Sequence, residues 1–308
     1  MGLLSVVIPA YNEEAMVPIA ARRIRDILRA EDIEAELIFV DDGSSDGTWA
    51  AIAAAAKEDS ALRGLRFSRN FGKEAALLAG LAHARGDCCA TIDCDLQHPP
   101  EKLVEMYRLW QEGYQVIEGV KESRGEESAL HGFCARAFYK IMTRATGIDM
   151  SRSSDFKLLD RRAVDAILSL PERDTFYRAL SGWVGFRSAS VCFEVAPREQ
   201  GQSKWSGWKL TKYALRQITS FTSSPMQIVT ALGALMLALA AVMGVQTLYN
   251  KFMGRAAEGF TTVIIVTLLV GSIIMMSLGI MGCYLAKMFD EVKGRPRYIV
   301  ADELGGGA

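Results

Sequence analysis

The sequence has little net charge and no cysteine pattern typical of disulfides or metal clusters. It holds 35 Lys and Arg against 36 Asp and Glu, and the resulting net charge of −1 argues against nucleic acid as a partner. Its six cysteines form no C-x-x-C pair and show no Cys/His ligand spacing. We interpret them as reduced, mostly buried thiols of a cytosolic domain. No signal peptide is predicted, because the apolar stretch at residues 3–8 is short and lacks a basic start.

Charged residues are absent from two long stretches of the second half. None occurs between Arg216 and Lys251, or between Glu258 and Lys287. Each stretch is longer than the ~20 mainly apolar residues that span a bilayer. We therefore predict transmembrane helices at residues 226–245 and 261–283, within a helical hairpin at residues 225–286. A buried helix pair of a soluble protein is the alternative, but glycines recur in both stretches and suit close helix packing in lipid.

A basic, amphipathic segment precedes the first of these stretches. On a helix at residues 206–224, Lys209, Lys212 and Arg216 share one face, and apolar residues occupy the opposite one. This pattern fits a helix on an anionic membrane surface with Trp205 and Trp208 as interfacial anchors, or a helix packed on the preceding domain. Basic residues also follow the second stretch, and few lie between the two. The positive-inside bias therefore predicts both ends of the chain in the cytoplasm.

The first half alternates strand and helix patterns. We predict buried strands near residues 4–8, 37–40, 64–67, 88–92 and 115–118, with helical patterns between the earlier ones. Asn12 is a candidate N-cap for the helix that follows the first strand. Such alternation predicts an α/β domain with a mainly parallel sheet. Polar clusters at residues 9–13, 41–46 and 93–97 follow three strands, at the sheet edge where such folds bind ligands.

Two carboxylates one residue apart follow the strand at residues 88–92. Strand alternation puts Asp93 and Asp95 on the same side of the chain. Hard oxygen ligands at this position suit Mg²⁺ or Mn²⁺ bound together with substrate phosphates. The alternative is that Asp95 only caps the next helix.

These segments carry a family resemblance. Residues 7–14, 40–48 and 68–74, together with Asp93-Cys94-Asp95-Leu96-Gln97, resemble family 2 glycosyltransferases. Within that family the chain is similar to the polyprenyl-phosphate glycosyltransferases, a group that includes dolichyl-phosphate mannose synthase and bactoprenol glucosyltransferase. The resemblance implies a GT-A (Rossmann-like) catalytic domain, a nucleotide-sugar donor, inversion at the anomeric carbon and a divalent cation. It also implies a homo-oligomer, expected to be a tetramer, with one helical hairpin per subunit.

The resemblance also assigns donor and metal residues. Positions that hold the donor's base and ribose correspond to Pro9, Tyr11, Glu13, Val40 and Asp42. Positions that hold the diphosphate correspond to Asp93, Cys94 and Asp95, and the metal positions correspond to Asp93, Asp95 and Gln97. Cys94 stands where Ala is usual, and His98 replaces a frequent Asp. Further donor contacts correspond to Lys121, where the family usually has Arg, and to Arg198 and Lys204. A solvated basic loop is the alternative for Arg198 and Lys204.

Other residues are assigned to catalysis and to the acceptor. Asp155 matches the family's third active-site carboxylate and, with Asp95, is a candidate catalytic residue. Because an acceptor phosphate is already anionic, we expect Asp155 to position the acceptor or balance charge; a strand-edge turn residue is the alternative. Arg124 and Arg136 are candidates for the acceptor phosphate, and ordinary surface charges otherwise.

The sequence thus predicts a multi-pass enzyme of the bacterial inner membrane. Residues 1–205 form the cytoplasmic GT-A domain, 206–224 the juxtamembrane helix, 225–286 the transmembrane hairpin and 287–308 a cytoplasmic tail. The expected reaction transfers glucose from UDP-glucose to undecaprenyl or another polyprenyl phosphate, for glycan or lipopolysaccharide modification. GDP-mannose, UDP-GlcNAc or an aminoarabinose nucleotide are alternative donors. A processive synthase is disfavoured because no Gln-x-x-Arg-Trp motif occurs, and a catalytically silent nucleotide-sugar-binding subunit is a further alternative.

Overall fold

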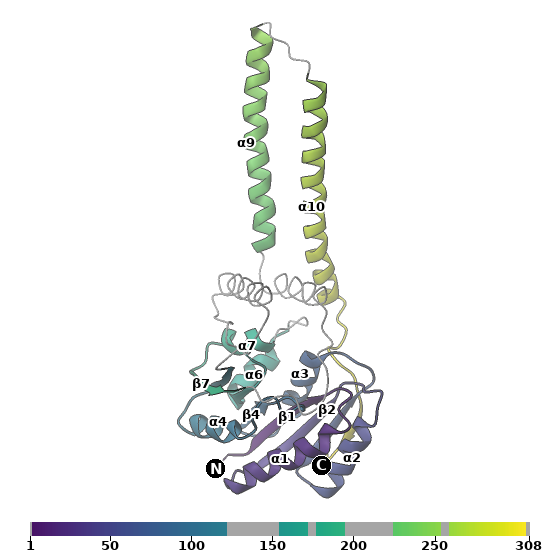
Figure 1. Ribbon diagram of the computed structural model, residues 1–308, viewed down its shortest axis with the longest axis vertical. Helices are drawn as coiled ribbons and strands as arrows, with labels where there is room; N and C mark the ends of the chain where they lie inside the picture. Colours follow the sequence, from purple (N-terminus) through teal and green to yellow (C-terminus); the bar gives the residue numbers. More distant parts are fainter. Residues whose placement is uncertain (1, 122–153, 172–176, 195–223, 254–258, 306–308) are drawn as a thin grey trace. The chain divides into compact units, whose positions relative to one another are not determined.

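The computed structural model describes residues 2–121, 154–171, 177–194, 224–253 and 259–305 (Figure 1). The chain divides into two units. The first comprises residues 1–206 and 296–308, and the second comprises residues 207–295. The first unit therefore takes its residues from both ends of the sequence.

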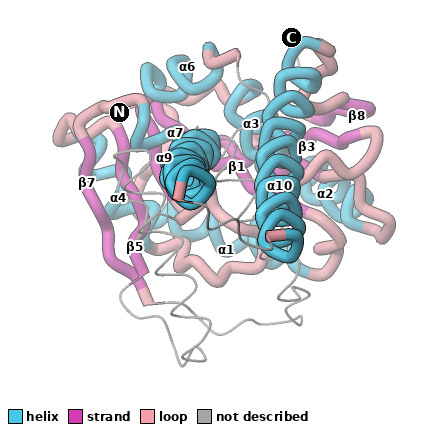
Figure 2. Tube along the Cα trace, turned by 90° about the horizontal axis from the view of Figure 1, so that it is seen from above, coloured by secondary structure: helices cyan, strands magenta, loops and turns pink. Residues whose placement is uncertain are grey.

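Within the described residues, eight strands form one sheet in the order β7-β5-β6-β4-β1-β2-β3-β8. The strands are β1 (Leu4–Ala10), β2 (Ala35–Asp41), β3 (Leu62–Phe67), β4 (Cys88–Thr91), β5 (Val116–Lys121), β6 (Lys157–Asp160), β7 (Ser188–Phe193) and β8 (Val300–Leu304). The neighbours β4, β1, β2 and β3 run parallel, whereas β6 pairs antiparallel with both β4 and β5. Figure 2 shows β5 and β7 toward one edge of the sheet and β3 and β8 at the other.

Helices cover both faces of the parallel centre. They are α1 (Met16–Ala30), α2 (Thr48–Glu58), α3 (Lys73–His83), α4 (Lys102–Gln111), α6 (Arg161–Ser169) and α7 (Tyr177–Trp183). Helix α1 contacts α2 and α4, while α3 contacts α6, which in turn contacts α7. Because central strands are buried on both faces, β1 and β2 are continuous apolar runs instead of alternating ones.

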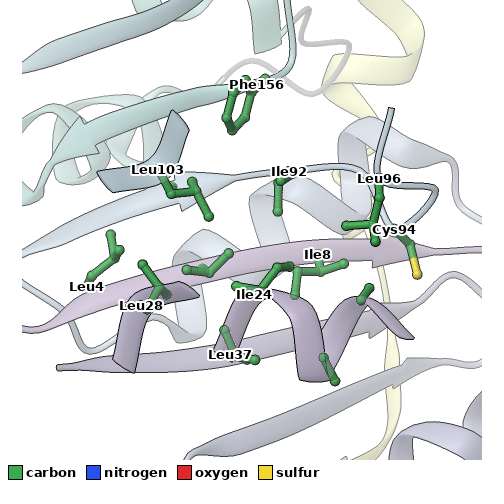
Figure 3. Close-up of a cluster of buried hydrophobic side chains, with 14 of the residues drawn as sticks. Leu4, Ile8, Ile24, Leu28, Leu37, Ile92, Cys94, Leu96, Leu103 and Phe156 are labelled. Atoms are coloured by element: carbon green, nitrogen blue, oxygen red, sulfur yellow. The ribbon is translucent and has the colours of Figure 1, made fainter. Parts of the chain in front are cut away.

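The two faces of β1 pack differently. Leu4 and Ile8 join the main hydrophobic cluster with Ile24 and Leu28 of α1 (Figure 3). The buried residues of α1 recur every three or four positions and form the single apolar stripe that this packing needs. On the opposite face Val7 meets Gly80 of α3, where an added Cβ would lie 2.2 Å from a Val7 methyl. The absent side chain lets α3 approach the strand that leads into the site.

The structure contains all five strands that the sequence predicts and three that it does not, namely β6, β7 and β8. The prediction of residues 287–308 as a tail is wrong in part. Helix α10 continues to Val292, and β8 is an edge strand of the sheet that pairs antiparallel with β3. The side chain of Arg63 on β3 contacts Glu303 at 3.2 Å and ties this strand to the sheet.

The second unit contains two long helices, α9 (Ser224–Phe252) and α10 (Phe260–Val292), which contact each other. Both predicted apolar segments are therefore helical. Among the described residues, one segment is long and apolar enough to cross a membrane, Leu269–Val292, with a mean hydropathy of 1.9. The segment Ala231–Gln246 of α9 is apolar but shorter. Two membrane spans therefore remain a prediction.

Candidate active site

The loops after β1 and β2 are joined by side-chain hydrogen bonds. Asn12 lies in the left-handed region, with φ 56°, and its Oδ1 accepts the Ser45 amide at 2.9 Å. The Asn12 amide donates to Ser44 Oγ at 2.9 Å. Helix α1 begins at Met16, and its N-cap residue makes no side-chain capping bond. The prediction of Asn12 as the N-cap is thus wrong, because its side chain holds the neighbouring loop instead.

Asp42 is fixed at the end of β2 by the backbone of a third loop. The amides of Phe71 and Gly72 donate to its carboxylate at 2.7 and 2.9 Å. Burial raises the pKa of Asp42, and these two hydrogen bonds oppose the rise. At Gly43, with φ 66°, an added Cβ would lie 2.4 Å from the Arg69 backbone, so the two loops require a glycine here.

Asp93 and Asp95 follow β4, and Lys73 of α3 lies against Asp93. The Lys73 ammonium is 2.6 Å from Asp93 Oδ1. Asp95 Oδ1 accepts the Gln97 amide at 3.2 Å across a sharp turn, in which Leu96 has φ 53°. Burial works against the charge of Lys73, but the attraction of the nearby carboxylates raises its pKa. The ammonium therefore stays protonated beside the two-carboxylate motif.

Asp155 forms the other half of this charge network. Lys73 lies 2.8 Å from Asp155 Oδ2, and the Arg178 guanidinium donates to Oδ1 at 2.7 Å and to Oδ2 at 2.9 Å. The Asp155 side chain is 9% exposed. Burial alone would raise the pKa of this carboxyl, yet the two cations hold it well below its ordinary value. Asp155 is therefore a buried carboxylate with both oxygens engaged.

Glu74 lies next to this network. Its carboxylate accepts the amide of Tyr177 at the start of α7, at 2.8 Å. Burial, and then the charge of Asp155, raise the pKa of Glu74 to about 7. The backbone of Asp155 is also held to β4. The Thr91 hydroxyl donates a hydrogen bond to the Asp155 carbonyl at 2.5 Å.

A pocket of about 370 Å³ lies beyond the ends of β1, β2 and β4. Its lining residues are Pro9, Ala10, Tyr11, Glu13, Asp42, Asn70, Gly72, Lys73, Ala76, Asp93, Cys94 and Asp95. The pocket lies where the topology of a parallel sheet places ligands. Tyr11 is 49% exposed at this site and offers an aromatic surface to a ligand.

The pocket brings together seven of the residues that the resemblance assigns to the donor, from Pro9 through Asp95. Three others do not line it. Val40 is fully buried in β2, Gln97 is partly buried in the turn after Asp95, and Lys121 is exposed at the end of β5. The last two donor residues, Arg198 and Lys204, and the two acceptor candidates, Arg124 and Arg136, lie outside the described residues.

Two cations of the site, Lys73 and Arg178, are not among the residues predicted from the sequence. Lys73 belongs to the segment at residues 68–74 on which the resemblance rests, so a role for it could have been expected. Arg178 lies on α7 far along the chain, and only the fold brings it to Asp155. No pattern in the sequence around Arg178 distinguishes it from a surface arginine.

The donor set fits a hard divalent cation that is also held by its substrate. Asp93 and Asp95 both line the pocket and offer carboxylate oxygens. Among the residues described, no group of three or more His, Cys, Asp and Glu side chains could hold a metal by itself. Mg²⁺ and Mn²⁺ bind in this manner, through one or two carboxylates with substrate phosphates completing the coordination.

Comparison with known proteins gives concordant results. Residues 5–168 match the model of glycosyl transferase family 2. An uncharacterized glycosyltransferase of Synechocystis is 39% identical over 98% of this chain and 96% of its own length. A prophage bactoprenol glucosyl transferase homolog of Escherichia coli is 35% identical over 96% of this chain and 98% of its own.

A solved structure matches the first unit. Glucosyl-3-phosphoglycerate synthase of Mycobacterium tuberculosis, in complex with Mn²⁺, UDP and phosphoglyceric acid, has a TM-score of 0.51 and 22% identity. The match covers 71% of this chain and 77% of that one, and it shows a shared fold. The first unit has the GT-A fold, with its Rossmann-like, mainly parallel sheet. The chain belongs to glycosyl transferase family 2.

Proposed function

We propose that this protein transfers a hexose from a nucleotide-sugar to a polyprenyl phosphate, with inversion at the anomeric carbon and UDP-glucose as the donor. The observation that carries the proposal is the pocket in which Asp42, Asp93, Asp95 and Lys73 converge beyond the parallel strands. The near full-length similarity to a bactoprenol glucosyl transferase homolog supports a polyprenyl phosphate acceptor and glucose as the sugar.

The nucleoside binds at the end of the pocket formed by the loops after β1 and β2. Tyr11 presents its ring to the base, and Asp42 offers a carboxylate whose orientation the amides of Phe71 and Gly72 fix. A carboxylate held in one orientation favours a base that carries a hydrogen-bond donor at the matching position. Pro9 and Glu13, which also line the pocket, complete the site for the base and ribose.

The diphosphate lies against Asp93, Asp95 and Lys73. Asp93 and Asp95, with Gln97, would hold Mg²⁺ or Mn²⁺, and the cation would supply positive charge to neutralise the leaving nucleoside diphosphate. Lys73 adds a fixed positive charge at the same end of the pocket. Fixed charges of this kind stabilise a transition state strongly because they need no reorganisation during the reaction.

Asp155 acts through the cations that surround it. Both of its oxygens are engaged by Lys73 and Arg178, and its pKa is lowered, so it is poorly suited to accept a proton near neutral pH. The reaction does not require such a base, because an acceptor phosphate already carries the negative charge of a nucleophile. Asp155 therefore holds Lys73 in place and balances its charge.

The acceptor phosphate needs further positive charge. Two unit charges of like sign ~4 Å apart repel by about 4 kcal/mol at an effective dielectric constant of 20. Lys121, Arg124, Arg136, Arg198 and Lys204 are the basic residues assigned to relieve this repulsion between the donor diphosphate and the acceptor phosphate. Their assignment rests on the family resemblance.

We further propose that α9 and α10 anchor the enzyme in the bacterial inner membrane, with the catalytic unit in the cytoplasm. The apolar segment Leu269–Val292 and the flanking basic residues support this orientation. Subunits assemble as a homotetramer in this proposal. The lipid-linked sugar then serves glycan or lipopolysaccharide modification.

The test is a transfer assay with purified full-length protein in detergent. The protein is incubated with undecaprenyl phosphate, Mg²⁺ or Mn²⁺, and UDP-glucose, GDP-mannose, UDP-GlcNAc or a UDP-aminoarabinose. We expect UDP release and a glucosylated lipid with UDP-glucose, both dependent on the lipid. Transfer from another nucleotide-sugar alone would correct the donor. Donor binding without any turnover would instead identify a silent binding subunit.

A further inference from the structure

His98 occupies an unusual place beside the two-carboxylate motif. It follows β4 in the loop that carries Asp93 and Asp95, and it is only 6% exposed. Its ring stacks on Phe156 with centroids 5.2 Å apart and planes 10° apart. The ring of Phe193, on β7, makes a T-shaped contact with His98, with centroids 5.3 Å apart and planes at 85°. Two aromatic side chains thus fix the plane and direction of the imidazole.

The fixed ring directs one nitrogen toward Asp93. His98 Nδ1 lies 3.7 Å from Asp93 Oδ2, and it has no hydrogen-bond partner among the described residues. Nearly all buried polar atoms in proteins have such a partner, and leaving one without costs about 1–3 kcal/mol. The other oxygen of Asp93 is held by Lys73 at 2.6 Å. Asp93 therefore lies between a cation on one side and an unpaired imidazole nitrogen on the other.

A small rotation of Asp93 would complete the contact. Hydrogen bonds from nitrogen to oxygen span about 2.7–3.2 Å, so Oδ2 needs to move by less than about 1 Å. The Nδ1–H tautomer of histidine is the one that can donate to a carboxylate, and it needs no net charge. A carboxylate that binds a metal is itself commonly hydrogen-bonded by a neighbouring side chain, which orients it.

We propose that His98 is a positioning residue for Asp93, which donates its Nδ1–H to Asp93 Oδ2 when that carboxylate binds the divalent cation. The proposal rests on the proposed function, because it takes Asp93 as a metal ligand. The chain has a histidine where the resemblance leads us to expect an aspartate, so it supplies a neutral donor where a carboxylate would repel Asp93.

Three substitutions separate this role from packing. His98→Phe keeps an aromatic ring between Phe156 and Phe193 but removes the N–H donor. His98→Asn carries an amide nitrogen close to the position of Nδ1, whereas His98→Gln carries one close to the position of Nε2. His83→Phe is the matched control, because His83 bonds Ala79 on α3 and does not line the pocket.

The measurement is Mn²⁺ binding to the full-length protein with UDP, followed by the electron paramagnetic resonance signal of free Mn²⁺. It needs no turnover. Loss of a residue that orients a metal ligand lowers metal affinity by about 10- to 100-fold, and we expect this for His98→Phe and for His98→Gln. We expect His98→Asn to recover most of the affinity and His83→Phe to keep all of it. Melting temperatures report separately on packing.

Several results would overturn the proposal. Wild-type Mn²⁺ affinity in His98→Phe would show that the ring acts only by packing. Equal affinities for His98→Asn and His98→Gln would show that the position of the donor is unimportant. If the wild-type protein itself binds no Mn²⁺ with UDP, the metal step of the proposed function fails as well. That last outcome is distinguishable, because it precedes any substitution.

Discussion

Replacing Glu74 by Gln should remove much of the pH dependence of stability between about pH 4.5 and 7. Burial and the charge of Asp155 raise the pKa of Glu74 from 4.5 to about 7. Gln keeps an oxygen that accepts the Tyr177 amide, which now bonds Glu74 at 2.8 Å. The substitution therefore removes the titration and preserves the hydrogen bond.

The sign follows from which state binds the proton. Between pH 4.5 and 7 the folded protein keeps the proton of Glu74 while the unfolded chain releases it. Protonation of Glu74 thus stabilises the folded state fully below pH 4.5, and this stability is lost as the pH rises through about 7. The shift from 4.5 to about 7 corresponds to at most about 3 kcal/mol. Glu74→Gln lacks this titration. Its free energy of unfolding should therefore fall less than that of wild type when the pH is raised from 5 to 8.

The assay compares melting temperatures of the full-length protein in detergent at pH 5 and pH 8. For a unit of this size, 1 kcal/mol of stability corresponds to about 2–4 °C in melting temperature. The melting temperature of wild type should therefore drop by several degrees more between pH 5 and pH 8 than that of Glu74→Gln. Glu105→Gln, on an exposed position of α4, is the control and should behave as wild type. Equal pH dependence in Glu74→Gln and wild type would refute the role of Glu74.

Three further predictions concern the proposed reaction. Asp95→Asn should keep its contact with the Gln97 amide and remain folded, yet lose at least about 100-fold in transfer; activity that persists in excess chelator would contradict this. Arg178→Lys loses the two-point contact with Asp155, so Asp155 should hold Lys73 less firmly and kcat/KM should fall below the wild-type value; an unchanged kcat/KM would contradict it. A cysteine in place of Ala256 should react with an impermeant reagent outside intact cells, whereas labelling of the catalytic unit from outside would reverse the orientation.

The centre of the fold is predictable because it depends on local patterns. Strands β1, β2 and β4 are mostly apolar and almost wholly buried, and polar clusters follow each of them. Once such strands are taken as parallel, their carboxyl ends meet at one edge of the sheet. Asp42, Asp93 and Asp95 could therefore be expected in one pocket from the sequence.

The edges of the sheet depend on pairings between distant segments. Strand β6 lies antiparallel between β4 and β5, and Leu158 on it pairs with Ala90 and Ile117. Strand β8 is short and polar, with Asp302 and Glu303 exposed on it. Its sequence resembles a charged tail, and only its pairing with β3 makes it a strand. Register across such separations is not encoded in a local pattern.

The contacts of Asp155 connect the antiparallel strand β6 to the charged side chains of the pocket. Asp155 immediately precedes Phe156 and β6, and Arg178 lies on α7, so both belong to the part of the fold that sequence patterns do not predict. Lys73 and Asp93 belong to the parallel centre, and Lys73 bridges the two parts through bonds of 2.6 Å to Asp93 and 2.8 Å to Asp155. The charges of the site therefore hold β6 and α7 against the donor pocket, and the same bonds that orient Lys73 also stabilise this part of the fold.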